Sequence, residues 1–114
     1  MSVEFVDADE DLAEVFAIRR KVFVDEQGVS QAEEFDGEDS KALHLAARAG
    51  SRIVGVARVR FPTPGKAKLE RMAVLEPYRR WGVGTSIVSF VMEDLKRRGA
   101  GKVVLRAQRQ ALDR

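Results

Sequence analysis

The stretch Arg79-Arg80-Trp81-Gly82-Val83-Gly84 decides how this chain is interpreted, because it joins two segments of different periodicity. Before it, residues 69–74 are typical of a strand, and after it an amphipathic segment continues to Gly99. The start of a helix carries unpaired N–H groups and a partial positive charge, and glycines let an anion approach the backbone closely. The stretch therefore predicts a phosphate-binding turn between a strand and a helix.

The glycine spacing alone leaves the bound compound open. A P-loop requires Gly-x-x-x-x-Gly-Lys-Ser/Thr, which the chain does not contain. A Rossmann turn requires a third glycine, and Ile87 stands at that position. In a further interpretation, the glycines only allow the helix to pack closely.

Strand and helix patterns on both sides of the turn predict one domain spanning residues 1–114. Strands are expected at 2–6, 42–49, 52–61, 66–74 and 102–107, and helices at 9–24 and 82–98. A capping box from Asp7 and Glu10, a tight hairpin at 49–52, a polar loop at 27–39 and a further helix at 108–114 complete the prediction. The order β-α-β-β-β-α-β indicates an α/β (α+β) fold, a mixed sheet with helices packed on both faces and a parallel pair around 82–99.

Composition limits the classes of function. The chain has 114 residues, 45% of them hydrophobic, and a formal net charge of +2. The basic excess is too small to predict a nucleic-acid surface. The absence of cysteine excludes disulfides, thiolate metal sites and cysteine nucleophiles. No apolar run approaches the ~20 residues that span a membrane, and no signal peptide is visible, so we expect a cytoplasmic protein without a bound metal.

Two wider patterns resemble one known family. The pattern Val74-x-x-Pro77-x-Arg79-x-x-Gly82-x-Gly84 is similar to the acetyl-CoA signature Gln/Arg-x-x-Gly-x-Gly/Ala of the GNAT family of N-acetyltransferases. The segments 19–27 and 35–39, with His44, look like the ElaA/YjcF-like branch of that family. The predicted order of elements also matches the family.

The resemblance implies that acetyl-CoA is the cosubstrate. Backbone N–H groups of residues 80–85 would bind its pyrophosphate, with the guanidinium groups of Arg79 and Arg80 nearby. The fourth strand of the family carries a bulge and separates from the fifth, and the pantetheine arm lies in that gap. Trp81 would either cover the cofactor or pack on the sheet. The residues implied in cofactor binding are Met72, Ala73, Val74, Arg79, Arg80, Trp81, Gly82, Val83, Gly84 and Thr85.

The acceptor implied by the resemblance is a primary amine of a small molecule or peptide. Glu70, four residues before Val74 on the same strand, is the candidate base, because related enzymes often place a base there. A solvated glutamate, or one paired with Arg71, is the structural alternative. Glu26 and His44 are weaker candidates for substrate contact, and His44 has a structural alternative of its own. The acidic run 33–39 is typical of a solvated loop, although it could attract a cationic amine.

The sequence departs from the family near its end. Family members continue with an aromatic pair, where Arg114 stands here, and with two further strands. This predicts an exposed edge on the fifth strand, covered by a second copy or a partner chain. A catalytically silent acyl-CoA-binding module, and a fragment completed by another chain, are therefore alternatives to an active N-acetyltransferase.

Overall fold

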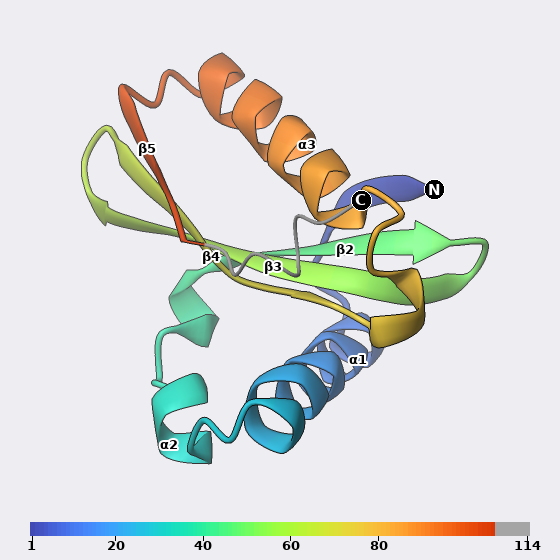
Figure 1. The fold of residues 1–114 in the computed structure, drawn as a ribbon. Helices are drawn as coiled ribbons and strands as arrows, with labels where there is room; N and C mark the ends of the chain where they lie inside the picture. The colour runs from blue at the N-terminus through green and yellow to red at the C-terminus, as the bar shows by residue number, and fades with distance from the viewer. Residues whose placement is uncertain (107–114) are drawn as a thin grey trace.

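A mixed sheet with helices on both faces organises residues 1–106, the part of the chain that the computed structural model describes (Figure 1). The strands pair in chain order. They are β1 Ser2–Val6, β2 Leu43–Ala49, β3 Arg52–Thr63, β4 Lys66–Val74 and β5 Lys102–Leu105. The helices are α1 Asp9–Arg19, the π-helix η1 Arg20–Glu26, α2 Gln31–Glu34, the 3-10 helices η2 Asp39–Lys41 and η3 Glu76–Tyr78, and α3 Val83–Arg97.

The strand pairing confirms the predicted order of elements. Strands β1 to β4 run antiparallel to one another, whereas β4 and β5 are parallel and are joined through α3. The predicted hairpin between β2 and β3 turns at Gly50, whose φ of 64° suits glycine. β5 forms one edge of the described sheet, and its cover by a second chain stays a prediction. The helix predicted at 108–114 lies outside the described residues.

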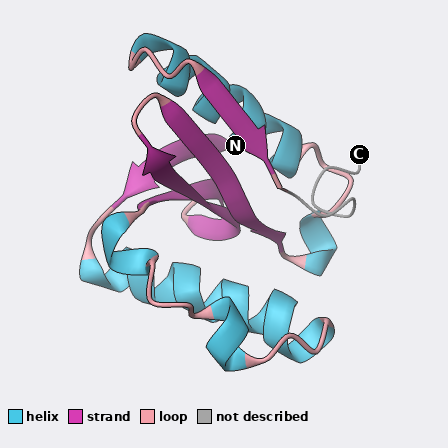
Figure 2. Ribbon diagram, turned by 90° about the vertical axis from the view of Figure 1, so that its left-hand side faces the viewer, coloured by secondary structure: helices cyan, strands magenta, loops and turns pink. Residues whose placement is uncertain are grey.

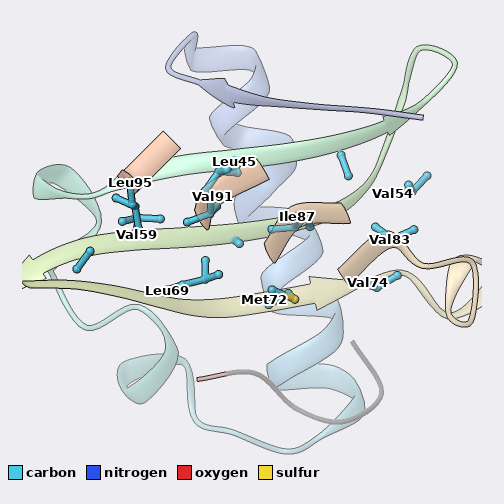
Figure 3. Packing of buried hydrophobic residues seen from close by; sticks show 13 residues of the cluster. Leu45, Val54, Val59, Leu69, Met72, Val74, Val83, Ile87, Val91 and Leu95 are labelled. Atoms are coloured by element: carbon cyan, nitrogen blue, oxygen red, sulfur yellow. The ribbon is translucent and has the colours of Figure 1, made fainter. Parts of the chain in front are cut away.

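Each face of the sheet carries its own hydrophobic cluster, because side chains alternate along a strand. Figure 2 shows helices on both sides of the sheet. On one face, α3 packs Ile87, Val91 and Leu95 onto the strands (Figure 3). On the other face, α1 and η1 contribute Val15 and Val22. The predicted helical stripes are therefore buried or half-buried, except that Met92 of α3 is 46% exposed.

Gly55 of β3 allows α3 to begin close to the sheet. A Cβ at this position would lie 2.6 Å from Cγ1 of Val83, the first residue of α3, and such a distance requires something to shift. Gly82 precedes the helix with a φ of 76°, a left-handed conformation that glycine adopts without strain. At the other end, Gly99 N–H donates to Lys96 and Ala100 N–H donates to Leu95, which is the Schellman ending expected with Gly99.

The N-terminal helix differs from its prediction at both ends. Its N-cap is Ala8 and receives no side-chain hydrogen bond, so the predicted capping box of Asp7 and Glu10 is wrong. The α-helix ends at Arg19 and continues as a π-helix to Glu26, whereas the periodicity predicts one α-helix over 9–24. Single π-helical segments are frequent at functional sites. None of the helices within residues 1–106 combines the length and apolarity of a membrane span.

Candidate functional site

Arg71 forms a bulge in β4. Between the pair Arg58–Glu70 and the pair Val56–Ala73, β3 advances by two residues while β4 advances by three. Arg71 lies in this step with a φ of 55°, which is left-handed and uncommon for a residue with a side chain. The resemblance predicts a bulge in this strand, and the structure has one.

β4 separates from β5 just before the bulge. The parallel pairing ends at Leu69 of β4, whose carbonyl accepts a hydrogen bond from Arg106 N–H at 2.8 Å. Beyond Leu69, β4 has no parallel partner within residues 1–106. In the part of the chain that the structure describes, the sheet is therefore open beside the last residues of β4, in the strand pair that the resemblance assigns to pantetheine.

Two residues at the end of β4 direct backbone groups into this opening. The N–H of Leu75 donates to a β3 carbonyl at 2.9 Å, and successive strand residues point their backbone groups to opposite sides. Ala73 therefore faces β3, while Met72 and Val74 face the opening. The Val74 carbonyl agrees with this direction, because it accepts from Nε of Arg79 on the side away from β3. Of the three predicted pantetheine contacts, Met72 and Val74 are oriented for that role.

The turn before α3 leaves a group of N–H donors without acceptors. The Trp81 N–H, one of the predicted donors, is bonded to the Tyr78 carbonyl at 3.4 Å. After Trp81, Ser86 is the next residue whose N–H is bonded, to the Gly82 carbonyl at 2.9 Å, and no side chain caps the helix. Residues 82–85 have no acceptor for their N–H groups within residues 1–106. Such donors at the positive end of a helix bind anions. All of them belong to the predicted pyrophosphate contacts: Gly82, Val83, Gly84 and Thr85.

The two arginines of the turn have different surroundings. Nη2 of Arg79 donates to both carboxylate oxygens of Glu26, at 3.1 and 2.9 Å, and its Nε donates to Val74. Glu26, predicted as a substrate contact, is thus the partner of a predicted phosphate contact. Arg80 is exposed, has a φ of 73° and makes no hydrogen bond or ion pair within residues 1–106. Its guanidinium is therefore free to meet a phosphate.

Trp81 projects from the same turn. Its side chain is 65% exposed, and its ring meets that of Tyr78 edge-on with centroids 5.1 Å apart. Of the two roles predicted for Trp81, packing on the sheet does not fit an exposed ring. The ring is instead available beside the unpaired N–H groups.

A cleft of about 590 Å³ opens where β4 leaves β5. Its walls come from β4 and β5 on one side and from η1, α2 and the segment between them on the other. The lining residues are Phe23, Val29, Glu33, Glu34, Lys68, Glu70, Arg71, Met72, Leu105 and Arg106. The cleft therefore brings together Glu70 and Met72, which the sequence predicts, with two glutamates that the sequence predicts only as part of an acidic run.

Two fully buried arginines hold this acidic run against the sheet. Arg19 of α1 donates to Glu34 at 2.6 Å and to Asp39 at 2.7 Å. The carboxylates that Arg58 of β3 contacts are those of Asp36, Asp39 and Glu70. Both arginine side chains are 0% exposed, and a buried charge is stable only when it is paired. The run predicted as a solvated loop is instead fixed by ion pairs.

Glu70 lies inside this network. Its buried side chain accepts from Arg58, Arg60 and Lys68, whereas Arg71 contacts the segment around α2. Burial raises the pKa of Glu70, but the hydrogen bonds from Arg60 and Arg58 more than offset that effect and lower the pKa to about 2. Glu70 is therefore neither the solvated glutamate nor the Arg71 partner of the structural alternative, and it is a weak base.

We expect Glu70 to make the fold sensitive to acid. A carboxyl group whose pKa falls from 4.5 to about 2 on folding contributes stability that is present above pH 4.5 and lost as the pH falls toward 2. The shift corresponds to about 3 kcal/mol. Urea unfolding between about pH 7 and pH 2 should show the free energy of unfolding falling more steeply for the wild type than for Glu70→Gln. An equal fall of the free energy of unfolding with pH in both proteins would contradict this role of Glu70.

His44 lies away from the cleft. It is buried on β2, where Nε2 is 2.9 Å from the Asp39 carbonyl and the ring meets Phe16 edge-on. Burial lowers the pKa of His44, and its Nδ1 has no hydrogen-bond partner among the described residues. The structure does not bring His44 to the residues that line the cleft. Within residues 1–106, no group of three or more histidine and carboxylate side chains is arranged to hold a metal ion.

Sequence comparisons identify relatives along most of the chain. A model of the acetyltransferase (GNAT) family matches residues 11–113. The uncharacterized protein YyaT of Bacillus subtilis is 39% identical over 97% of this chain and 76% of its own length. The uncharacterized N-acetyltransferase YjcF of the same organism is 36% identical over 91% of this chain and 74% of its own length, in agreement with the predicted branch.

Solved structures share the fold at lower identity. A putative N-acetyltransferase from Lactobacillus plantarum has a TM-score of 0.85 and 21% identity, with 96% of this chain and 77% of the other covered. A GNAT family acetyltransferase from Brucella melitensis in complex with acetyl-CoA has a TM-score of 0.76 and 20% identity, with 94% and 77% covered. The solved structures show a shared fold, whereas the family match and the two Bacillus relatives show the family itself. This chain belongs to the GNAT family of acetyltransferases.

Proposed function

We propose that this protein transfers the acetyl group of acetyl-CoA directly to a primary amine of a small molecule or peptide. The observation that carries the proposal is the opening of the sheet beside the uncapped start of α3. The N–H groups of residues 82–85, which have no acceptor within residues 1–106, and the outward-facing backbone of Met72 and Val74 offer the two kinds of contact that an acyl-CoA requires, although the Val74 carbonyl already accepts from Arg79.

The proposed cofactor contacts follow from these donors. The pyrophosphate would accept hydrogen bonds from the N–H groups at the start of α3, and Arg80 would add a positive charge. The amides of the pantetheine arm would pair with Met72 and Val74 as an added strand pairs with a sheet edge. The thioester would then lie beside the bulge of β4, at the cleft.

The proposed reaction needs no covalent intermediate on the protein. The amine nitrogen attacks the thioester carbonyl carbon, the carbon–sulfur bond breaks, and CoA leaves as the thiolate while the nitrogen loses a proton. Negative charge develops on the carbonyl oxygen during the attack. An N–H group of β4 that faces the opening, such as that of Val74, would stabilise this charge as an oxyanion hole does.

The acidic wall of the cleft supports a cationic amine as the acceptor. Glu33 and Glu34 line the side opposite β4, whereas Lys68, Arg71 and Arg106 bring positive charge to the β4 and β5 side. A cationic ligand would therefore be attracted toward the two carboxylates before it gives up its proton. An aminoglycoside acetyltransferase in complex with sisomicin shares this fold, so aminoglycosides belong in a test panel beside polyamines and peptides.

Thiol release from acetyl-CoA tests the proposal. The chain has no cysteine, so a thiol reagent detects only the CoA product. We expect release that depends on both the protein and one of the amines in the panel, and mass spectrometry should find the amine heavier by one acetyl group. Calorimetric binding of CoA without turnover on any amine would favour a silent acyl-CoA-binding module instead. A protein that neither binds CoA nor acetylates any amine would contradict the whole proposal.

A further inference from the structure

The two buried glutamates of the cleft differ in how many of their lone pairs are occupied. A carboxylate offers about four lone-pair positions. Glu70 receives Nε and Nη2 of Arg58, Nε and Nη2 of Arg60, and Nζ of Lys68. These donors occupy both of its oxygens, so no position remains for the proton of a substrate.

Glu34 keeps part of its carboxylate free. Its Oε2 accepts from Nε of Arg19 at 2.6 Å, and its Oε1 lies 3.2 Å from Nε of Arg71. Within residues 1–106 these are the donors to its side chain, which leaves about two positions open. The side chain is 3% exposed, and Glu34 lines the cleft together with Met72.

Glu34 is also held in one position relative to the bulge of β4. Its backbone carbonyl accepts from Nη2 of Arg19 at 2.9 Å and from Nε of Arg71 at 3.4 Å, so both arginines contact its main chain as well as its carboxylate. Arg71 is the bulged residue itself and precedes Met72, whose backbone faces the opening. A catalytic group needs this kind of support from residues around it.

We propose that Glu34 is the general base of this site, a role that rests on the acetyltransferase function proposed above. The amine nitrogen forms its bond to the acetyl carbon, and the electron pair of the carbon–sulfur bond leaves with sulfur. The proton that nitrogen loses passes to the free lone pair of Glu34, directly or through one water. Glu34 then returns the proton to the thiolate or to solvent, so the protein ends unchanged.

The electrostatic surroundings support the same assignment. Burial raises the pKa of Glu34 above its ordinary value, and the contacts with Arg19 and Arg71 reduce this effect without reversing it. The pKa of Glu70 moves in the opposite direction. Two carboxyl groups whose pKa values are driven apart in one cleft commonly have different roles, and the one nearer neutral pH is the better base. Glu33 lines the same cleft, but its exposed carboxylate has no side-chain partner that fixes it within residues 1–106.

The test compares Glu34→Gln with Glu33→Gln and Glu70→Gln, using an amine that the wild type acetylates. We expect Glu34→Gln to lower kcat roughly a hundredfold and to remove the acid limb of the pH profile, as loss of a general base does, while the Kd for CoA changes little. Glu33→Gln should change kcat by only a few fold and should act mainly on the KM for a cationic amine, because Glu33 is proposed to attract that amine but not to take its proton. Glu70→Gln should retain the acid limb. If Glu34→Gln does not fold, Glu34→Asp can replace it in the test. Aspartate keeps the negative charge of the network but is one methylene shorter, so its carboxylate lies farther from the amine, and kcat should fall by a smaller factor.

A second measurement separates a base from a merely structural residue. A weakly basic amine loses its proton more readily during the attack and depends less on a base. The defect of Glu34→Gln should therefore shrink for a fluorinated alkylamine relative to the parent alkylamine. Equal defects for both amines, or loss of the acid limb only in Glu33→Gln or Glu70→Gln, would overturn the assignment of Glu34. A wild type that binds CoA but acetylates no amine would instead overturn the proposed function, and this proposal with it.

Discussion

Replacing Gly84 with valine is expected to weaken the binding of CoA by more than about 1 kcal/mol, since one hydrogen bond to a charged group is worth at least that much. Gly84 is buried in the first turn of α3, and its N–H is one of the donors that have no acceptor within residues 1–106. A branched side chain at this position crowds the space that a pyrophosphate needs in order to reach these donors. Gly82 is a poorer site for the test, because its left-handed φ of 76° would strain any replacement.

The matched control for Gly84→Val is Ser86→Val on the same helix turn. The Ser86 N–H already donates to the Gly82 carbonyl, so it is not a free donor for phosphate. Both variants place the same branched residue in α3, and neither should lose helix propensity to a large extent, since valine ranks close to serine and above glycine. Calorimetry should give a Kd at least about fivefold weaker for Gly84→Val and nearly unchanged for Ser86→Val. An unchanged Kd in a folded Gly84→Val protein would contradict the proposed phosphate site.

The parts of the fold that the sequence predicts depend on local pattern. The apolar stripe of α3, its ending at Gly99 and the hairpin at Gly50 each follow from residues close together in the chain. The bulge and the opening of the sheet have no such signal here. They were expected only from the resemblance to the GNAT family, because a register shift depends on which residues of β3 face β4.

The ion pairs around Arg19 and Arg58 could not be predicted either, because they also depend on contacts between distant parts of the chain. Arg58 lies in a strand pattern where a charged residue normally indicates a solvent-facing position, yet its side chain is fully buried. Its partners lie in another strand and in a loop, so only the folded register brings them together. Glu33 and Glu34 are adjacent identical residues, and nothing in the sequence tells which of them α2 turns toward Arg19.

Pairing between distant residues also explains why two predicted site residues have unexpected neighbours. The sequence assigns Arg79 to phosphate and Glu26 to substrate, but it does not indicate that these two side chains bond to each other. The extension of the first helix as a π-helix carries Glu26 to this contact. The motif predicts where the turn lies, whereas the partner of each side chain depends on the segment packed against it.

Replacing Arg58 with methionine is expected to cost about 3 kcal/mol or more of unfolding free energy, because removing one partner of a buried ion pair leaves uncompensated charges. The pKa of Arg58 is raised by its contacts with Asp36, Glu70 and Asp39, against the opposing effect of burial, so its side chain stays charged. Methionine retains much of the volume but neutralises none of these carboxylates. The acidic segment that carries Glu34 would then lose one of the arginines that hold it.

Arg60→Met is the matched control, because Arg60 lies on the same strand and also bonds Glu70, but its side chain is 24% exposed. An ion pair with one partly exposed member contributes less than a fully buried one, so this variant should lose clearly less stability than Arg58→Met in urea unfolding. Combining Arg58→Met with Glu70→Gln should restore part of the stability, since the double variant removes one of the three carboxylates that lose a donor when Arg58 is replaced. Two results would contradict the central role of Arg58 in the network. One is a similar loss of unfolding free energy for Arg58→Met and Arg60→Met, and the other is strictly additive losses in the double variant Arg58→Met with Glu70→Gln.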